Sequence, residues 1–173
     1  GWGPADVLLH VPVTLALKDA VPQVSIVAPY HTVRLAVAFD TAQLKQFDNL
    51  ADLGETLIGT EQASIGSLLV ARQDGGRFRG NLRHFRNASL AVADLRAGKL
   101  AAVIALRGEL EAALAGQPRY RIVSAPFPVS VHTAWPVGMA VKKASTELAA
   151  ALTAAVAERT ASGELARIFA RHH

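Results

Sequence analysis

Short apolar runs alternate along this chain with longer stretches in which apolar residues recur every three or four positions. The short runs predict buried β-strands, and the longer periodic stretches predict amphipathic helices. The predicted strands cover residues 6–11, 24–27, 33–39, 57–59, 82–85, 99–106, 121–123 and 137–141. Between them, helices are predicted from a cap at Ser64 to Gly75, from Asn87 or Ser89 to Gly98, and over 107–115. Strands that alternate with helices favour a doubly wound α/β fold with mainly parallel sheets.

The last forty or so residues carry clear helix signals. Ser145 is placed to cap a helix, and Glu147 in its first turn suits the helix dipole. We expect one apolar stripe of this helix to be buried, namely Leu148, Leu152, Ala155 and Val156. Gly163 supplies the backbone freedom to end the helix. A short closing helix follows, with an apolar face made by Leu165, Ile168 and Phe169.

Composition narrows the class of protein. Of 173 residues 51% are hydrophobic and 18% charged, which is typical of an ordered globular chain. The formal net charge is +4 and the basic residues are spread along the chain, so we expect no nucleic-acid partner. No apolar run is long enough to span a membrane. The absence of cysteine fits an oxidising compartment.

Signatures of catalysis are lacking. The histidines are isolated, with no His-x-x-x-His spacing, and no Gly-x-Ser-x-Gly turn or glycine-rich phosphate loop is present. We therefore expect no enzymatic activity, no metal site and no cofactor. A basic cluster is interpreted as a solvated strand face, with contact to phosphates or an acidic protein as the alternative. It contains Arg77, Arg79, Arg83, His84 and Arg86.

Several phrases resemble one protein family. The run from Trp135 to Arg171 resembles the end of type II periplasmic solute-binding proteins (bacterial extracellular solute-binding protein family 3), the receptors of amino-acid-type ABC importers. Pro29-Tyr30 is similar to the family's hinge segment, and Asn-Leu-Ala-Asp-Leu at 49–53 to its connector. Residues 95–104 resemble its most recognisable internal phrase. The resemblance covers residues 6–171 and implies a periplasmic binding protein of two lobes.

The resemblance also implies a domain organisation. Residues 1–39 would be the remainder of the first lobe and the entry to the hinge. Residues 40–130 would form a complete second lobe, and 131–173 the hinge return with helices packed on the first lobe. Because the family carries further βα units ahead of this point, we expect an incomplete first lobe and a signal peptide removed upstream. An unpaired sheet edge would then favour a homodimer or strand exchange.

Ligands of open α/β sheets bind at the carboxyl ends of strands, where helix N-termini present free amides. Ser64, with Thr60 and Gln62, occupies the place of the family's Gly-Ser or Gly-Thr turn, which implies contact with an anionic group. The alternative is a plain helix cap. Tyr30 and Trp135 are candidates for aromatic surfaces lining a cleft, with core packing as the alternative.

The family's charged grip on amino acids is missing. Its ammonium-binding aspartate falls at Leu106, and the aspartate of its internal phrase falls at Ala101. The stretch that would carry the carboxylate-binding arginine offers only Lys18. Aliphatic side chains cannot replace charge-assisted hydrogen bonds, so a conventional amino-acid receptor is disfavoured unless a shifted register brings in Asp19 or Glu109.

Two functions remain open. Asp6-Val7, Val11-Pro12 and Pro29-Tyr30 resemble the J-type branch associated with quinoprotein methanol dehydrogenases, although His31 stands where that branch has a second tyrosine. We expect a non-enzymatic periplasmic accessory factor that assists or activates a PQQ-containing methanol dehydrogenase. The alternative is the substrate-binding receptor of an ABC importer for a small solute other than a standard amino acid. The expected partner is accordingly a periplasmic dehydrogenase or a membrane permease.

Overall fold

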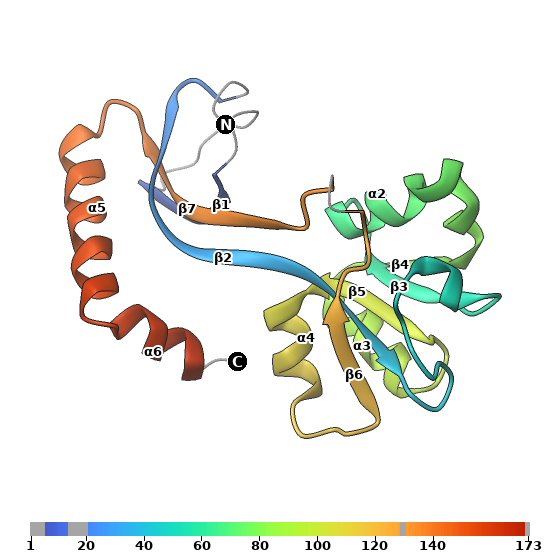
Figure 1. Cartoon of the computed structure of the whole chain (residues 1–173). Helices are drawn as coiled ribbons and strands as arrows, with labels where there is room; N and C mark the ends of the chain where they lie inside the picture. The colour runs from blue at the N-terminus through green and yellow to red at the C-terminus, as the bar shows by residue number, and fades with distance from the viewer. Residues whose placement is uncertain (1–5, 14–20, 129–130, 172–173) are drawn as a thin grey trace. The chain divides into compact units, whose positions relative to one another are not determined.

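The computed structural model describes residues 6–13, 21–128 and 131–171 (Figure 1). The chain divides into two compact units. The first unit joins residues 1–33 with 134–172, and the second comprises residues 34–133. No helix in the described ranges combines the length and apolar character needed to cross a membrane.

A mixed sheet forms the centre of the second unit. It is built from the end of β2 (Val24–Asp40), β3 (Ile58–Glu61), β4 (Leu82–Phe85), β5 (Ala102–Leu106) and β6 (Tyr120–Ser124), in the order β6-β2-β5-β3-β4. Strand β3 pairs in parallel with β4 and β5, whereas β2 is antiparallel to β5 and β6. The predicted α/β fold class is confirmed.

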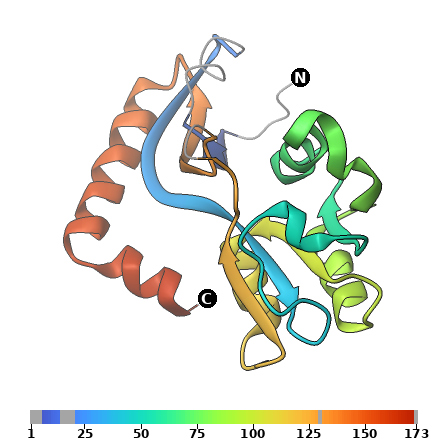
Figure 2. The same ribbon diagram turned by 45° about the vertical axis from the view of Figure 1, so that its right-hand side comes forward.

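Helices cover both faces of this sheet. Helices α3 (Ala88–Arg96) and α4 (Arg107–Leu114) share an apolar core with alternate residues of β2 and β5 on one face. Helix α2 (Ile65–Arg72) packs on the other face (Figure 2). There Gly66 lies against the side chain of Ile104. This two-sided cover explains why β2 and β5 read as continuous apolar runs.

Two 3₁₀ segments complete the second unit, η1 (Leu50–Leu53) and η2 (Gln73–Asn81). The helix predicted to reach Gly75 ends at Arg72, because Asp74 and the two following glycines have positive φ angles of 48, 67 and 95°. Such left-handed backbone cannot continue an α-helix. The predicted strand 99–106 likewise begins later, at Ala102.

Strands β1 (Val7–Pro12) and β7 (Ala134–Lys142) pair antiparallel in the first unit, and β7 neighbours β2. The β1–β7 register shifts between Leu8 and Val11, where His10 has a φ of 59°. The Tyr30 hydroxyl accepts a hydrogen bond from the His10 amide at 2.9 Å and lies 2.8 Å from His10 Nδ1. These contacts fix the bulge to β2.

Strand β2 corrects one prediction. Instead of two strands separated at Pro29-Tyr30, residues Val24–Asp40 form one strand. Ala28, immediately before Pro29, has a φ of 50°, so the chain bends without leaving the sheet. A bend of this kind lets a strand tolerate proline.

The C-terminal elements are α5 (Thr146–Ala161) and α6 (Glu164–Arg171). Ser145 occupies the N-cap position of α5, but its side chain makes no capping hydrogen bond. In the expected stripe Val156 is buried and the two leucines are half-buried, whereas Ala155 is exposed and that part of the prediction is wrong. The α6 ring of Phe169 stacks on His31 of β2, with centroids 4.2 Å apart.

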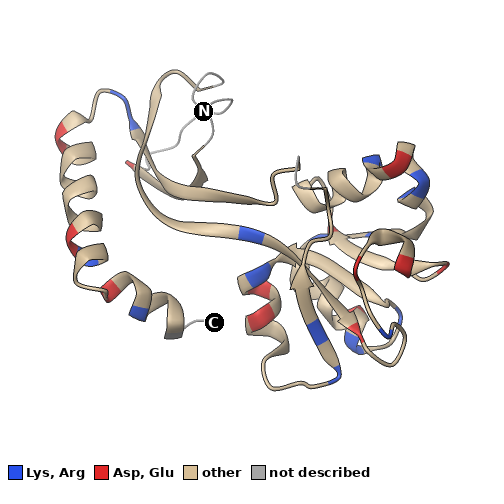
Figure 3. Ribbon diagram, in the orientation of Figure 1, with Lys and Arg blue, Asp and Glu red and all other residues tan. Residues whose placement is uncertain are grey.

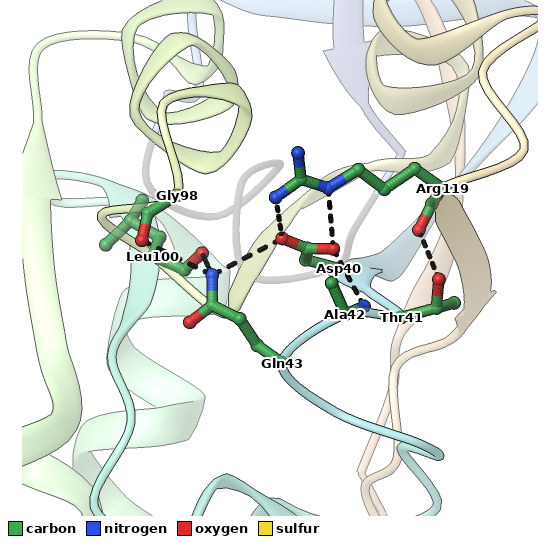
Figure 4. A network of polar contacts seen from close by, with 7 residues as sticks. All are labelled: Asp40, Thr41, Ala42, Gln43, Gly98, Leu100 and Arg119. Atoms are coloured by element: carbon green, nitrogen blue, oxygen red, sulfur yellow. Dashed lines mark hydrogen bonds and ion pairs between the residues drawn. The ribbon is translucent and has the colours of Figure 1, made fainter.

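An ion pair between the buried Asp40 and the half-exposed Arg119 helps to tie three parts of the second unit together (Figure 4). Asp40, at the end of β2, is fully buried and accepts two hydrogen bonds from Arg119, Nε to Oδ1 at 2.9 Å and a terminal nitrogen to Oδ2 at 2.6 Å. The Ala42 amide also donates to Asp40, at 3.0 Å. Gln43 donates to the Leu100 carbonyl at 2.9 Å, which links this corner to the start of β5.

Candidate ligand-binding site

The turn between β3 and α2 gathers hydroxyl groups at the carboxyl end of β3. Thr60 is fully buried, and its Oγ1 lies 3.1 Å from Ser64 Oγ. Ser64 caps α2, because its Oγ accepts a hydrogen bond from the Ser67 amide at 3.1 Å. Ala63 has a φ of 58°, a left-handed conformation that turns the chain between the end of β3 and the start of α2. The predicted cap at Ser64 is confirmed.

The first turn of α2 leaves donors for a ligand. The first amides of a helix have no acceptor within the helix itself. Within the described residues, nothing accepts a hydrogen bond from the amides of Ile65 or Gly66, and Gly66 is buried. Amides without a protein acceptor at the positive end of a helix are suited to bind an anionic group.

Ser67 extends the polar side of this turn toward β4. Its Oγ lies 2.8 Å from Nε2 of His84, which pairs with Thr60 in the β3–β4 register. No carboxylate among the described residues bonds His84, so the pair lacks the third group of a Ser-His-Asp arrangement. We interpret Ser67 and His84 as polar side chains that border the turn and hydrogen-bond to each other.

Two carboxylates lie at the same edge of the sheet. Glu61 is the last residue of β3, and Glu109 lies in the first turn of α4, directly after the parallel strand β5. Partial desolvation and the nearby Glu61 charge raise the pKa of Glu109, while the bond it accepts from the Leu106 amide at 3.3 Å lowers that pKa. Two acidic groups that repel each other attract a cation.

The sequence-predicted site residues fall in two places. Thr60, Ser64 and Gln62 lie in the β3–α2 turn. Gln62 is exposed, and its backbone N–H donates a hydrogen bond to the Phe85 carbonyl. Tyr30 and Trp135 lie on β2 and β7 of the first unit, both half-buried. Their contact with a ligand stays a prediction.

Leu106 takes the N-cap position of α4 without a side-chain cap, while Asp19 and Lys18 lie outside the described residues. Sequence reasoning missed Glu61, although its place at the end of a strand that precedes the Ser64 cap was a usable signal.

Other parts of the described chain offer less. A cavity of about 350 Å³ in the first unit is lined by apolar side chains and by His10, so it lacks the polar anchors that orient a charged solute. No group of three or more His, Cys, Asp or Glu side chains in the described ranges is arranged to hold a metal ion.

Comparison with known proteins identifies the fold. No family model matches the sequence, and no curated protein matches it. Among solved structures, the chain is similar to a mutant of ArgBP from T. maritima, at 21% identity and a TM-score of 0.70, over 95% of this chain and 66% of that one. It is also similar to an ancestral cationic amino acid solute-binding protein, at 16% identity and a TM-score of 0.74, over 96% and 68% of the two chains.

A third similar structure is the amino acid ABC transporter substrate-binding protein AbpA from Streptococcus pneumoniae, bound to L-arginine. It shares 20% identity and a TM-score of 0.72, over 94% of this chain and 65% of its own. The chain thus has the fold of type II periplasmic solute-binding proteins. It spans about two thirds of the length of these structures.

Proposed function

We propose that this protein binds a small solute that carries an anionic group and an amine, at the carboxyl ends of β3 and β5 in the second unit. The observation that carries the proposal is the backbone amide of the buried residue Gly66. It has no acceptor among the described residues and lies beside the hydroxyls of Thr60 and Ser64. A buried donor without a partner costs free energy, and an anionic ligand would supply the missing acceptor.

The amine follows from the acidic pair. Leu106 cannot hold an ammonium group, but Glu61 and Glu109 place two carboxylates at the neighbouring strand ends. A protonated amine would relieve their mutual repulsion and form charge-assisted hydrogen bonds. The fold shared with amino-acid-binding proteins supports a zwitterionic solute.

Calorimetric titration of the full chain tests this proposal with sets of three matched compounds. Each set contains an amino acid, its decarboxylated amine and its deaminated acid, and the sets vary the distance between the charged groups. We expect measurable heats only when both groups are present. Ser64→Ala and Glu109→Gln should each weaken binding about tenfold, since a charge-assisted bond contributes about 1.5 kcal/mol or more.

Matched controls are available in the same unit. Ser89 and Glu55 are exposed and lie outside the β3–α2 turn, so Ser89→Ala and Glu55→Gln should bind as the wild type does. Absence of heat with every compound, or equal binding by Ser64→Ala, would refute the proposal.

A second candidate is an accessory role toward a PQQ-containing methanol dehydrogenase in the periplasm. Two features favour it. The aliphatic Leu106 stands where the family has its ammonium-binding aspartate, and Pro29-Tyr30 resembles the J-type branch associated with methanol dehydrogenases. Co-elution with a purified methanol dehydrogenase, or a change in its turnover, would support this role. A chain that neither co-elutes with nor affects that enzyme would exclude it. Size-exclusion chromatography of the protein alone tests the expected homodimer.

A further inference from the structure

The positive charge of this chain is concentrated in one short segment. Residues 72–86, here called the basic segment, contain five arginines and one aspartate, a formal charge of +4. This equals the formal net charge of the whole protein, so the remaining residues balance to zero. The basic segment comprises the end of α2, the η2 turn and the edge strand β4 (Figure 3).

The arginines of the basic segment have no acidic partners within the described part of the chain. Ion pairs among the described residues involve Arg107, Arg119 and Arg159 but none of the arginines at 72, 77, 79, 83 and 86. Unpaired guanidinium groups within one short segment leave a positive field that a partner of opposite charge would neutralise.

Backbone carbonyls and a ring hold several of these side chains in place. Arg79 Nε donates to the Ala71 carbonyl at 3.0 Å, which fastens η2 to α2. Arg83 donates to the Leu82 carbonyl at 2.9 Å, and the Arg77 guanidinium lies 5.6 Å from the ring centre of Phe78. Because these contacts already restrict the side chains, less conformational entropy remains to be lost on binding.

An exposed apolar stripe continues into the basic segment along α2. Ile65 and Leu68 are 45% and 47% exposed, and with Arg72 they follow the three- and four-residue spacing of one helix face. Aliphatic side chains beside arginine are typical of protein interfaces. Phe78 is buried and Phe85 half-buried, which leaves no exposed aromatic ring in the segment for stacking on bases or entering a lipid layer.

Arginines on β4 also have a simpler explanation. Strand β4 is the last strand of the sheet order, and charged side chains on an edge strand prevent pairing with other chains. That explanation does not account for Arg72 and Arg77, which lie on α2 and η2. It also does not account for the apolar stripe.

We propose that the α2–η2 face, made of Ile65, Leu68, Arg72 and Arg77, binds an acidic segment of a partner protein that carries apolar side chains between its carboxylates. The guanidinium groups would bind the carboxylates, and the α2 stripe would cover the apolar side chains. This surface shares only Ile65 with the solute site: the backbone amide of Ile65 belongs to the β3–α2 turn, whereas its exposed side chain belongs to the α2–η2 face.

Fluorescence anisotropy with synthetic peptides tests the proposal on the full chain. The probe is a labelled peptide of Glu-Glu-Leu repeats, compared with a Glu-Glu-Ser peptide of equal length. We expect saturable binding of the leucine peptide that weakens with added salt. The double variant Arg72→Glu/Arg77→Glu should lose at least about tenfold in affinity, because attraction becomes repulsion. Leu68→Ser should remove the preference for the leucine peptide.

Reversal of Arg72 and Arg77 separates binding from edge protection, because both residues lie outside the edge strand β4 and the arginines of β4 are retained. The reversed variant should therefore stay as soluble as the wild type while it loses the peptide. Arg121→Glu on β6, at the opposite edge of the sheet, and Leu90→Ser on α3, 49% exposed on the opposite face, are the matched controls. Both should bind as the wild type does, and so should Ser64→Ala, which separates this proposal from the solute site.

Three results would overturn the proposal. One is the absence of saturable binding of either peptide to the wild type. Another is unchanged affinity of the Arg72→Glu/Arg77→Glu variant. The third is binding of polyphosphate or of phosphatidylglycerol vesicles without binding of the leucine peptide, which would assign the arginines to phosphate groups.

Discussion

Asp40 shows how one ionised side chain holds a corner of the second unit. Its carboxylate has no exposed surface, yet the pKa lies at about 2, below the usual 3.8. The main cause is the hydrogen bonds from Arg119, and the amide of Ala42 and the side chain of Gln43 act in the same direction against the cost of burial. A carboxyl with a lowered pKa stabilises the folded state above its usual pKa and loses that contribution as the pH falls through the lowered value.

Asp40→Asn should therefore destabilise the protein at neutral pH by about 2 kcal/mol, since half of a charge-assisted pair is lost while Arg119 can still reach water. The difference in free energy of unfolding between the two proteins should shrink as the pH falls from 3.8 toward 2. Urea unfolding at several pH values measures it. Asp48→Asn is the control, because Asp48 is exposed and forms no ion pair in the described chain. A difference that does not vary with pH would contradict this account.

The pKa of Glu109 is shifted in the opposite direction to that of Asp40. Its pKa is raised from 4.5, chiefly by partial desolvation and also by Glu61, so a bound amine competes with a proton for this carboxyl. The affinity for an amine-bearing solute should increase as the pH rises through that raised value, with protons released on binding. Titration calorimetry in two buffers of different ionisation enthalpy counts the protons. The Glu109→Gln variant should release none, and equal release by both proteins would argue against a role for this carboxyl.

At the scale of single residues, the sequence identified the Ser64 cap because serine before an apolar helix is a local signal. It could not identify the free amide of Gly66, since that requires knowing which acceptors the fold brings near. The Glu61–Glu109 pair depends on the parallel neighbours β3 and β5, whose paired residues are 44 positions apart in the sequence. Such pairings are set by topology and not by local pattern.

At the scale of elements, strands and helices of the second unit follow their apolar patterns closely. The exceptions have local causes. The positive φ of Ala28 carries β2 through Pro29 as one strand, and Asp74 with its glycines ends α2 early. Alanine seldom adopts such an angle, so the continuous strand could not be read from residue type, whereas aspartate followed by glycine is a turn signal. Ala155 is exposed beside the buried Val156, because consecutive helix residues do not face the same side.

Aromatic contacts join helix α6 to β2. Phe169 stacks on His31 with centroids 4.2 Å apart and a plane angle of 18°, and it lies parallel to Tyr30 at 6.3 Å. Phe169→Ala should remove this contact, and amides of α6 should exchange with solvent about tenfold faster or more, because aromatic pairs contribute about 0.5–1.5 kcal/mol beyond their buried area.

Hydrogen–deuterium exchange read by peptide separates this effect from a general loss of stability. Amides of the second unit should be unaffected by Phe169→Ala. The control Ile168→Ala removes a neighbouring side chain that is 39% exposed and should change α6 little. Equal effects of the two substitutions would show that the stacked rings do not hold the helix.

At the scale of the whole molecule, the chain passes between two compact units near residues 33 and 134. The resemblance carried by Pro29-Tyr30 and by the Trp135–Arg171 run predicted the binding-protein fold that the solved structures share. It could not predict the ligand, because identity of about 20% preserves the fold while side chains such as Leu106 change. Charge is also organised at this scale, since the net positive charge resides in the basic segment.

The most direct test of the solute site is a two-dimensional ¹H–¹⁵N NMR titration of the full chain with the compound that gives the largest heat in the calorimetric sets. We expect the amide resonances of Ile65 and Gly66 to move downfield with added compound as they gain a hydrogen-bond acceptor, and Ser64→Ala to weaken this shift. Saturable binding that moves other resonances but leaves the chemical shifts of these two amides unchanged would contradict the proposed site.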